Sequence, residues 1–310
     1  MQELAKSIMP LLSEHGNNIT LNEKLFARIK AVYDQKDQVN ITPEQNKLLE
    51  KVYNSFVRSG ANLEGEAKEQ YRTLSKELSL LTLQFGENNL KETNDYKLVL
   101  TDPAQLAGLP QSAIDAAAET AKEKGVEGWV FTLQAPSYSP FMTYASNRDL
   151  RCKLYMAYNT KCTHDNETNN LEIVKKLVNT RLAIAQLLGY SSFAEYNLQE
   201  RMAENSGNVY KLLDQLLDAY TPTAKQEYAE VEALARQLEG SDFTVMPWDW
   251  SYYSHKLKDQ KFQIDDEMLR PYFELSKVKE GVFGLATRLY GITFKKKQRY
   301  PGISQGCGCI

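Results

Sequence analysis

Apolar residues recur every three or four positions along most of this chain, which is the spacing of one face of an α-helix. Near the start, Leu4, Ile8 and Leu11 share such a face, and the Gly-Asn-Asn run at residues 16–18 is expected to end that helix. The pattern predicts helices over residues 2–14, from 20 to about 32, and over 43–59, 66–92, 112–124, 147–161, 166–188, 191–202 and 206–238.

The helix expected over residues 43–59 has the clearest start signal. Thr42 is a good N-cap, a proline follows it at the first helical position, and Gln45 can complete a capping box. The spacing within this helix predicts that Leu48, Val52 and Phe56 point inward. It should end at the Ser-Gly pair of residues 59–60.

Two of the expected helices are unusually long. The helix over residues 66–92 would extend about 40 Å at 1.5 Å per residue. Its apolar stripe predicts packing in a core and consists of Ala67, Tyr71, Leu74, Leu78, Leu81 and Phe85. The second long helix, over residues 206–238, contains Pro222, which should kink it or start a new helix. Gly240 is expected to close it.

Only two segments have the composition of β-strands. They are residues 96–100 and 129–133, which are rich in β-branched, leucine and aromatic side chains. We expect them to pair as one small sheet within a helical body. The fold class predicted from the pattern is therefore mainly α, as an elongated multi-helix domain with one two-stranded β element.

The stretch from residue 246 to residue 294 is the densest in aromatic side chains. It contains Trp248 and Trp250, then Tyr252 and Tyr253, and continues through an aromatic and leucine-rich run to Phe294. Large rings bury a great deal of area when they pack. The sequence therefore predicts a hydrophobic junction between helices here, around which the rest of the chain is arranged.

Composition excludes several classes of protein. The 310 residues carry a net charge of −3, so no strong field favours nucleic acid or an anionic membrane, and neither is an expected partner. No apolar run approaches the roughly 20 residues of a membrane span. The polar start is unlike a signal peptide, and four cysteines do not form a disulfide framework. A reducing, cytoplasmic location is the expectation.

Several short motifs occur in an order that resembles one known family, the zinc oligopeptidases of the thimet oligopeptidase and bacterial peptidyl-dipeptidase type. The motifs are Asn17-Asn18-Ile19-Thr20-Leu21-Asn22, Asn89-Leu90-Lys91-Glu92-Thr93, Asn147-Arg148-Asp149-Leu150-Arg151, Ala185-Gln186-Leu187-Leu188-Gly189-Tyr190 and Pro247-Trp248-Asp249-Trp250-Ser251-Tyr252-Tyr253. A sixth, Leu269-Arg270-Pro271-Tyr272-Phe273, precedes Gly291-Ile292-Thr293-Phe294. Each is weak alone, but together they span residues 1–294. The resemblance implies the helical half of such an enzyme.

The resemblance also implies zinc chemistry that this chain lacks. The family binds zinc through a helical His-Glu-x-x-His pair and a further carboxylate. The histidines here are His15, His164 and His255, and none is followed by glutamate. Cys162 and His164 could share a metal by spacing, but a surface pair at a helix end is the favoured interpretation. The sequence predicts no catalytic residue and no metal ligand, assigns no substrate-binding residue, and implies zinc only in the complete family enzyme.

The last residues depart from this pattern. We expect residues 1–294 to be an oligopeptidase-like, channel-wall region and residues 295–310 to be a tail outside the family. The tail begins with three lysines, which imply a run of adenines in the DNA. Codons can be chosen so that the frame one base later continues in a family-like way. The hypothesis is that the tail is a frameshift product.

Three functional hypotheses remain open at this point. The first is a non-catalytic fragment of a zinc oligopeptidase whose complete form cuts short peptides and releases C-terminal dipeptides. The second is a stand-alone helical protein that binds peptides or a partner. The third is one half of a split enzyme, in which a second chain supplies the catalytic half. Under the first and third hypotheses, this chain alone should be inactive.

Overall fold

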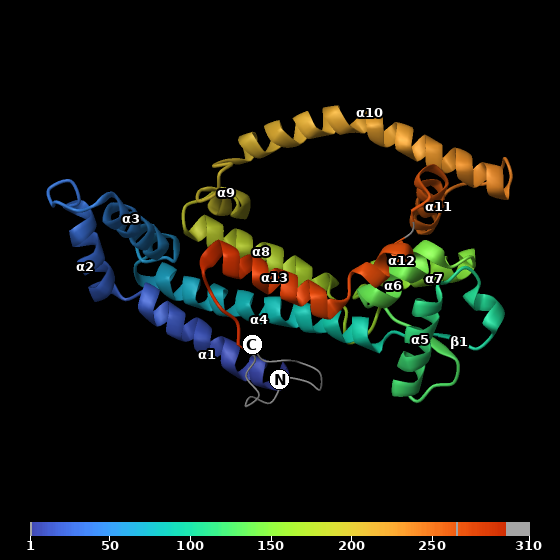
Figure 1. The fold of residues 1–310 in the computed structure, drawn as a ribbon. Coiled ribbons are helices and arrows are strands. Elements are labelled where there is room, and N and C mark those ends of the chain that lie inside the picture. Colours follow the sequence, from blue (N-terminus) through green and yellow to red (C-terminus); the bar gives the residue numbers. More distant parts are fainter. Residues whose placement is uncertain (1, 265, 296–310) are drawn as a thin grey trace.

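The computed structural model describes residues 2–264 and 266–295, and within these ranges the chain is mainly helical with one two-stranded sheet (Figure 1). The first elements are α1 (Gln2–Thr20), α2 (Glu23–Asp34), α3 (Pro43–Arg58), α4 (Gly65–Asp95), β1 (Leu98–Leu100), the 3-10 helix η1 (Pro103–Leu106), α5 (Gln111–Glu123) and β2 (Trp129–Phe131). They are followed by α6 (Ala135–Tyr144), α7 (Arg148–Asn159), α8 (Leu171–Leu187), α9 (Phe193–Leu198) and α10 (Ser206–Glu239). The last are η2 (Pro247–Asp249), α11 (Trp250–Phe262), α12 (Asp266–Leu269), η3 (Arg270–Tyr272) and α13 (Leu275–Tyr290). The predicted fold class, mainly α with one small sheet, is confirmed.

The long helix α4 lies at the centre of the molecule, with α1 and α8 packed along it. Its predicted stripe is buried where α8 covers it, since Leu81 packs with Ile173 and Leu177 of α8. At the far end of the stripe Phe85 is 40% exposed. The amphipathic pattern therefore predicted the helix and its buried Leu81, whereas the buried Lys68 lies outside the predicted stripe and most of the stripe is only half-buried.

The expected break at residues 16–18 is wrong. Helix α1 continues through Gly16 to Thr20, and Leu21 N–H still bonds to Asn17 O at 2.9 Å. The chain turns only where Asn22 accepts a hydrogen bond from Leu25 N–H at 3.0 Å and caps α2. A single glycine costs a helix about 1 kcal/mol, which packing against α4 offsets.

Helices α2 and α3 form a hairpin at one end of the molecule (Figure 1). Phe26 stacks on Tyr53 and Phe56, and the predicted capping box of α3 is present. The inward direction predicted for Leu48 is wrong, because this side chain is 63% exposed. Arg58 joins the hairpin to α9 by donating to Tyr196 O at 2.7 Å.

The small sheet and its helices hold the main core. Strands β1 and β2 pair antiparallel, with Val99 opposite Val130. Helices α5, α6 and α7 pack around this sheet over the largest group of buried side chains, which includes Leu100, Phe131, Phe141 and Leu154. The sequence analysis predicted no helix over α6, which contains two prolines. One of them lies in the first turn, where a helix tolerates proline.

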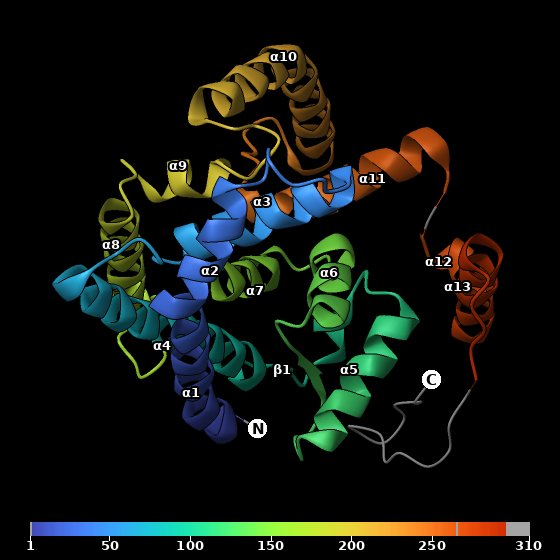
Figure 2. The same cartoon turned by 90° about the vertical axis from the view of Figure 1, so that its left-hand side faces the viewer.

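Helix α10 forms a long arch over the body, and α13 lies apart from the body (Figures 1 and 2). Pro222 does not end α10, which runs unbroken for 34 residues. The last turns of α10 pack on α11 around Val231, Ala235 and Tyr253. Within the described residues, no helix has the length and apolar character needed to cross a membrane.

The aromatic stretch at residues 246–294 divides into two parts. Its first part is a buried junction, as predicted, because Tyr252 and Tyr253 lie in the core and Trp248 packs against the main cluster. Its second part is not, since Leu275 is 81% exposed and Tyr290 is 74% exposed. The expectation of one hydrophobic junction is therefore wrong for α13, which presents its apolar side chains to solvent. The tail predicted to begin at residue 295 lies almost entirely outside the described residues.

Candidate functional site: a buried ion-pair junction beside an aromatic groove

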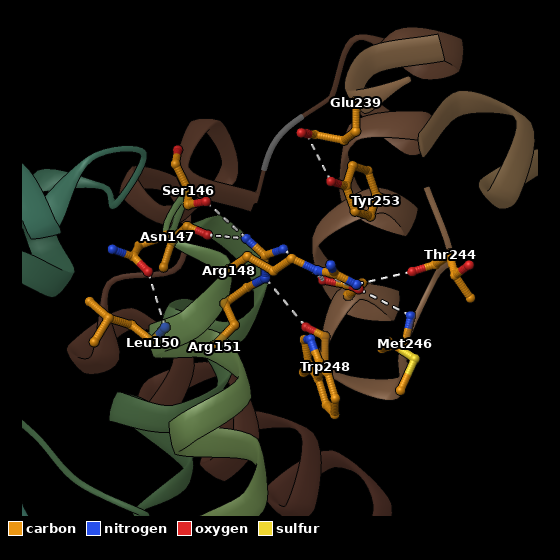
Figure 3. A network of polar contacts seen from close by, with 12 residues as sticks. Ser146, Asn147, Arg148, Leu150, Arg151, Glu239, Thr244, Met246, Trp248 and Tyr253 are labelled. Atoms are coloured by element: carbon orange, nitrogen blue, oxygen red, sulfur yellow. Dashed lines mark hydrogen bonds and ion pairs between the residues drawn. The ribbon is translucent and has the colours of Figure 1, made fainter. Parts of the chain in front are cut away.

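Two arginines of α7 face the segment that connects α10 to α11. Asn147 caps α7 by accepting a hydrogen bond from Leu150 N–H at 3.1 Å. The helix begins at the next residue, which places Arg148 and Arg151 three positions apart on one face. Both side chains reach Asp249, the last residue of η2. Figure 3 shows the two arginines directed from α7 toward the segment of Thr244, Met246 and Trp248.

Asp249 is fully buried, and both of its carboxylate oxygens are saturated. Arg148 donates from Nη2 to Oδ2 at 2.7 Å and from Nε to both oxygens at 3.1 Å. Arg151 donates from Nη2 to Oδ1 at 2.9 Å. The Met246 backbone N–H donates to Oδ2 at 3.0 Å. One carboxylate thus fastens a helix to a segment almost a hundred residues further along the chain.

Arg151 is the more buried arginine, with 1% of its surface exposed. Its remaining N–H groups donate to backbone carbonyls, to Ala145 O at 2.7 Å, Ser146 O at 3.2 Å and Trp248 O at 3.3 Å (Figure 3). Its guanidinium lies 4.1 Å from the centre of the Tyr252 ring. The buried charge is therefore paired, hydrogen-bonded and covered by an aromatic face, as such a charge requires.

The electrostatics of the junction keep Asp249 ionised. Burial raises the pKa of Asp249, but the hydrogen bonds from Arg148, Met246 and Arg151 together outweigh burial and hold its pKa below the ordinary 3.8. The hydrogen bond to Asp249 raises the pKa of Arg148. A carboxylate locked between two cations has no proton to give and no free oxygen to accept one. The junction therefore positions the chain and does not transfer protons.

Two adjoining hollows lie next to this junction, along α10. One, of about 640 Å³, is lined by residues of α7, α10, η2 and α11, namely Tyr155, Ala224, Glu227, Tyr228, Val245, Met246, Pro247, Trp250 and Ser251. The other, of about 530 Å³, is lined by α10 alone, through Tyr210, Leu213, Asp214, Leu216, Leu217, Tyr220, Thr221 and Ala224. Ala224 lines both, so the hollow between α10 and η2 adjoins the open face of α10, and we call the two together the α10 groove.

The residues considered as metal ligands from the sequence do not form a site. Glu92 accepts a hydrogen bond from Cys162 N–H at 2.7 Å, and its other oxygen is 3.8 Å from His164 Nε2. Burial and a hydrogen bond to Glu92 raise the pKa of the Cys162 thiol to about 11. Among residues 2–264 and 266–295, no group of three potential ligands meets.

The other two histidines lie far from this pair in the sequence, on other elements. His15 is on α1, and His255 is on α11 with its ring 4.6 Å from that of Tyr144. The acidic run at residues 265–267 includes Asp265, which is outside the described residues; Glu267 accepts a hydrogen bond from Ser112 at 3.0 Å. The sequence motifs that contain Arg148, Arg151 and Asp249 were recognised, but the contact between them was not predicted.

Comparison with known proteins places this geometry in a family. The sequence model of Peptidase family M3 matches residues 141–304, a little more than half of the chain. The matched range contains the whole buried junction. Oligopeptidase A of Escherichia coli is 34% identical over 302 residues, covering 96% of this chain and 44% of that protein. Dipeptidyl carboxypeptidase of the same organism is 32% identical over 303 residues, covering 97% and 44%.

The organellar oligopeptidase A of Arabidopsis thaliana is a more distant match, 32% identical over 279 residues, and the chain spans 35% of its length. The fold thus defines a mainly helical protein in which a buried ion pair joins α7 to η2. The chain belongs to Peptidase family M3. It spans less than half of the length of the curated relatives that it matches.

Proposed function

We propose that this chain is the helical, non-catalytic portion of a zinc-dependent oligopeptidase and that it forms one wall of the channel in which short peptides are cut. The observation that carries the proposal is its match to family relatives over 96% of its own length but only 44% of theirs. One matched relative is named a dipeptidyl carboxypeptidase. On this basis, release of C-terminal dipeptides is the finer form of the proposal.

In this proposal, zinc and the hydrolytic step belong to residues that this chain does not contain. Glu92 already accepts hydrogen bonds from the Cys162 backbone and from Thr168, and among the described residues no group of three potential ligands meets, so the region of Cys162 and His164 offers no support for a zinc site. Zinc in the complete enzyme would polarise a peptide carbonyl and activate water. The contribution of this chain would be to enclose and orient the peptide.

The exposed apolar face of α13 supports the proposal that a further part of the enzyme packs against it. Leu275, Val282 and Leu289 are 81%, 58% and 64% exposed, and they repeat at intervals of seven residues. Such a stripe normally packs against another element. Contiguous exposed apolar surface of this kind marks an interaction site or a liability to aggregate. The remaining part of the enzyme would cover it.

A chimera tests the proposal directly. This chain replaces the matched 302 residues of Escherichia coli oligopeptidase A, and cleavage of a quenched fluorescent peptide is measured with zinc and with a chelator. We expect chelator-sensitive cleavage by the chimera and none by the purified 310-residue chain. A cooperatively folded chimera without activity, or chelator-sensitive cleavage by the chain alone, would contradict the proposal.

Two further measurements separate this proposal from a stand-alone binding protein. If the chain is monodisperse, melts cooperatively and does not bind a hydrophobic dye, the hypothesis of a stand-alone protein is favoured. Dye binding would favour a fragment with an uncovered interface. Sequencing the DNA beyond codon 310 is the second measurement. A frame that continues to His-Glu-x-x-His supports the peptidase, and closed frames throughout would count against it.

A further inference from the structure

The α10 groove has the properties of a binding surface for peptides of a particular charge. We propose that it holds peptide segments that carry a lysine or arginine beside an apolar side chain. This inference rests on the proposed function, since it assigns a preferred substrate class to the wall of the channel. The groove's shape, its charges and its relation to the packed end of α10 each support it.

The apolar stripe of the groove continues an interface that already exists within the chain. Near the end of α10, Val231 and Ala235 are buried against α11. Going back along the helix, the same face continues with Ala224, Tyr220 and Leu217 at helical spacing. Tyr220 and Leu217 are 65% and 64% exposed. A face that is buried at one end and uncovered along the rest is prepared for a further apolar contact.

The groove turns toward the body of the molecule. Tyr155 of α7 and Pro247 of η2 line its wider hollow, opposite Tyr228 of α10. An occupant would therefore lie between α10 and the buried junction, and not on the outer surface of the arch. From residue 210 to residue 228 the helix extends about 27 Å, which equals roughly eight residues of an extended peptide.

The charges of the groove have one sign. Asp214 lines one hollow and Glu227 the other, and no lysine or arginine among the described residues lines either of them. Elsewhere on α10, Glu230 pairs with Lys261 and Glu232 pairs with Arg236. In the part of the chain that the structure describes, Asp214 and Glu227 have no hydrogen-bond or ion-pair partner. Two unpaired carboxylates along an apolar surface attract a cationic, amphipathic ligand.

Besides the carboxylates, the aromatic rings beside Glu227 can also bind a cation. The rings of Tyr228 and Trp250 stack at 5.8 Å with 7° between their planes. Trp250 is 39% exposed, so part of the residue remains accessible although Tyr228 stacks on its ring. A guanidinium or ammonium group near a tryptophan face is attracted to the ring, and arginine can stack on it as well. A carboxylate and an indole together therefore favour a basic side chain.

The test uses the purified 310-residue chain and a dye-labelled octapeptide, Ala-Phe-Arg-Ala-Ala-Phe-Arg-Ala. Two matched peptides replace both arginines by glutamate or both phenylalanines by serine. Fluorescence anisotropy at low salt measures each affinity. We expect the arginine–phenylalanine peptide to bind at least roughly tenfold more tightly than either, and its affinity to fall as salt screens the carboxylates.

Charge reversal in the groove provides the decisive variant. The double substitution Asp214→Lys and Glu227→Lys should reverse the preference, so that the glutamate peptide binds more tightly than the arginine peptide. Asp218→Lys is the matched control, because Asp218 lies on the same exposed part of α10 and lines neither hollow. It should leave the preference for arginine in place. Circular dichroism verifies that the variants keep their helical content.

Three results would overturn the inference. They are equal affinity for the arginine and glutamate peptides, the same response to Asp218→Lys as to the double variant, and the absence of binding at millimolar chain concentration. The cleavage assay on the chimera reads the proposed function separately. If the chimera is active but the groove fails these tests, peptide binding in the groove is rejected and the channel-wall function is retained.

Discussion

Removal of the Asp249 carboxylate is the sharpest test of the buried junction. The substitution Asp249→Ala deletes the partner of Arg151, whose side chain is 1% exposed, and of Arg148, whose side chain is 40% exposed. A cation left buried without its anion costs about 3–5 kcal/mol of unfolding free energy. We expect the loss to fall in this range, a large fraction of the stability of an ordinary domain.

The two arginines should respond unequally. Arg148→Ala removes a partner that is 40% exposed but donates three hydrogen bonds to a fully buried carboxylate, so its cost should lie between about 1 kcal/mol for an exposed pair and about 3 kcal/mol for a buried one. Arg151→Ala breaks a fully buried pair and frees three backbone carbonyls, so its cost should approach that of Asp249→Ala. The double variant Arg151→Ala with Asp249→Ala should cost less than the sum, because each single change strands the other charge.

The assay is urea unfolding at pH 7, followed by far-ultraviolet circular dichroism and by tryptophan fluorescence. Trp248 and Trp250 flank Asp249 in the sequence, so fluorescence reports on the junction itself. Asp115→Ala is the control, since this exposed aspartate accepts only a hydrogen bond from Gln111, and its cost should stay within about 0.5 kcal/mol. A cost for Asp249→Ala below about 1 kcal/mol, or equal to that of the control, would refute the reasoning.

Three further outcomes follow from the structure. Because the pKa of Asp249 is held below 3.8, its contribution to stability is present above that pH and is lost as pH falls through the lower, folded-state pKa. Urea midpoints from pH 5 to pH 2 should therefore fall more steeply in the parent chain than in Asp249→Ala, and parallel curves would contradict this. Cys162, at 4% exposure and with its pKa raised to about 11, should react with iodoacetamide at pH 8 more slowly than the half-buried Cys152, as peptide mass mapping can measure. Gly128→Ala should lower the free energy of unfolding by more than about 2 kcal/mol, because φ is +94° there and a Cβ would lie 2.2 Å from Leu100 O. Gly86→Ala, in open space on α4, should raise the free energy of unfolding by roughly 0.5–1 kcal/mol. Thermal or urea unfolding measures both.

Helix starts were predictable where the signal is local. The capping box at Thr42 and Gln45 appears in the structure as predicted, with Gln45 N–H donating to Thr42 at 3.3 Å. Asn147 likewise caps α7 at the predicted place. These bonds join residues three apart in sequence, so the sequence contains both partners and their spacing. Such a signal does not determine which residues from distant parts of the chain pack against the helix.

Helix interiors were less predictable at glycine and proline. The pattern ended the first helix before Gly16 and predicted no helix over residues 135–144, yet both segments are helical. The intrinsic cost of one glycine is about 1 kcal/mol, and proline costs little in a first turn. Packing of α1 on α4 and of α6 on the small sheet supplies more than this. Local preference is decisive only where tertiary contacts are few.

The junction shows where sequence reasoning ended. The motifs around Arg148 and around Asp249 were both identified, and Asp249, which stands between Trp248 and Trp250, carries a usable signal of a buried charge. Nothing in the spacing said that these two charges meet, since about a hundred residues separate them. The exposed stripe of α13 was equally undetermined, because an amphipathic pattern specifies a face and not what covers it.

The sequence by itself determined the helical class, the single small sheet, most helix starts and the family to which the chain belongs. These follow from local periodicity, capping and ordered motifs, each contained within a few residues. The tertiary structure decided which faces are covered, that Asp249 is saturated by two arginines, and that α10 leaves an acidic, aromatic groove uncovered. These depend on contacts between distant segments, whose energies arise only once the chain has brought the segments together.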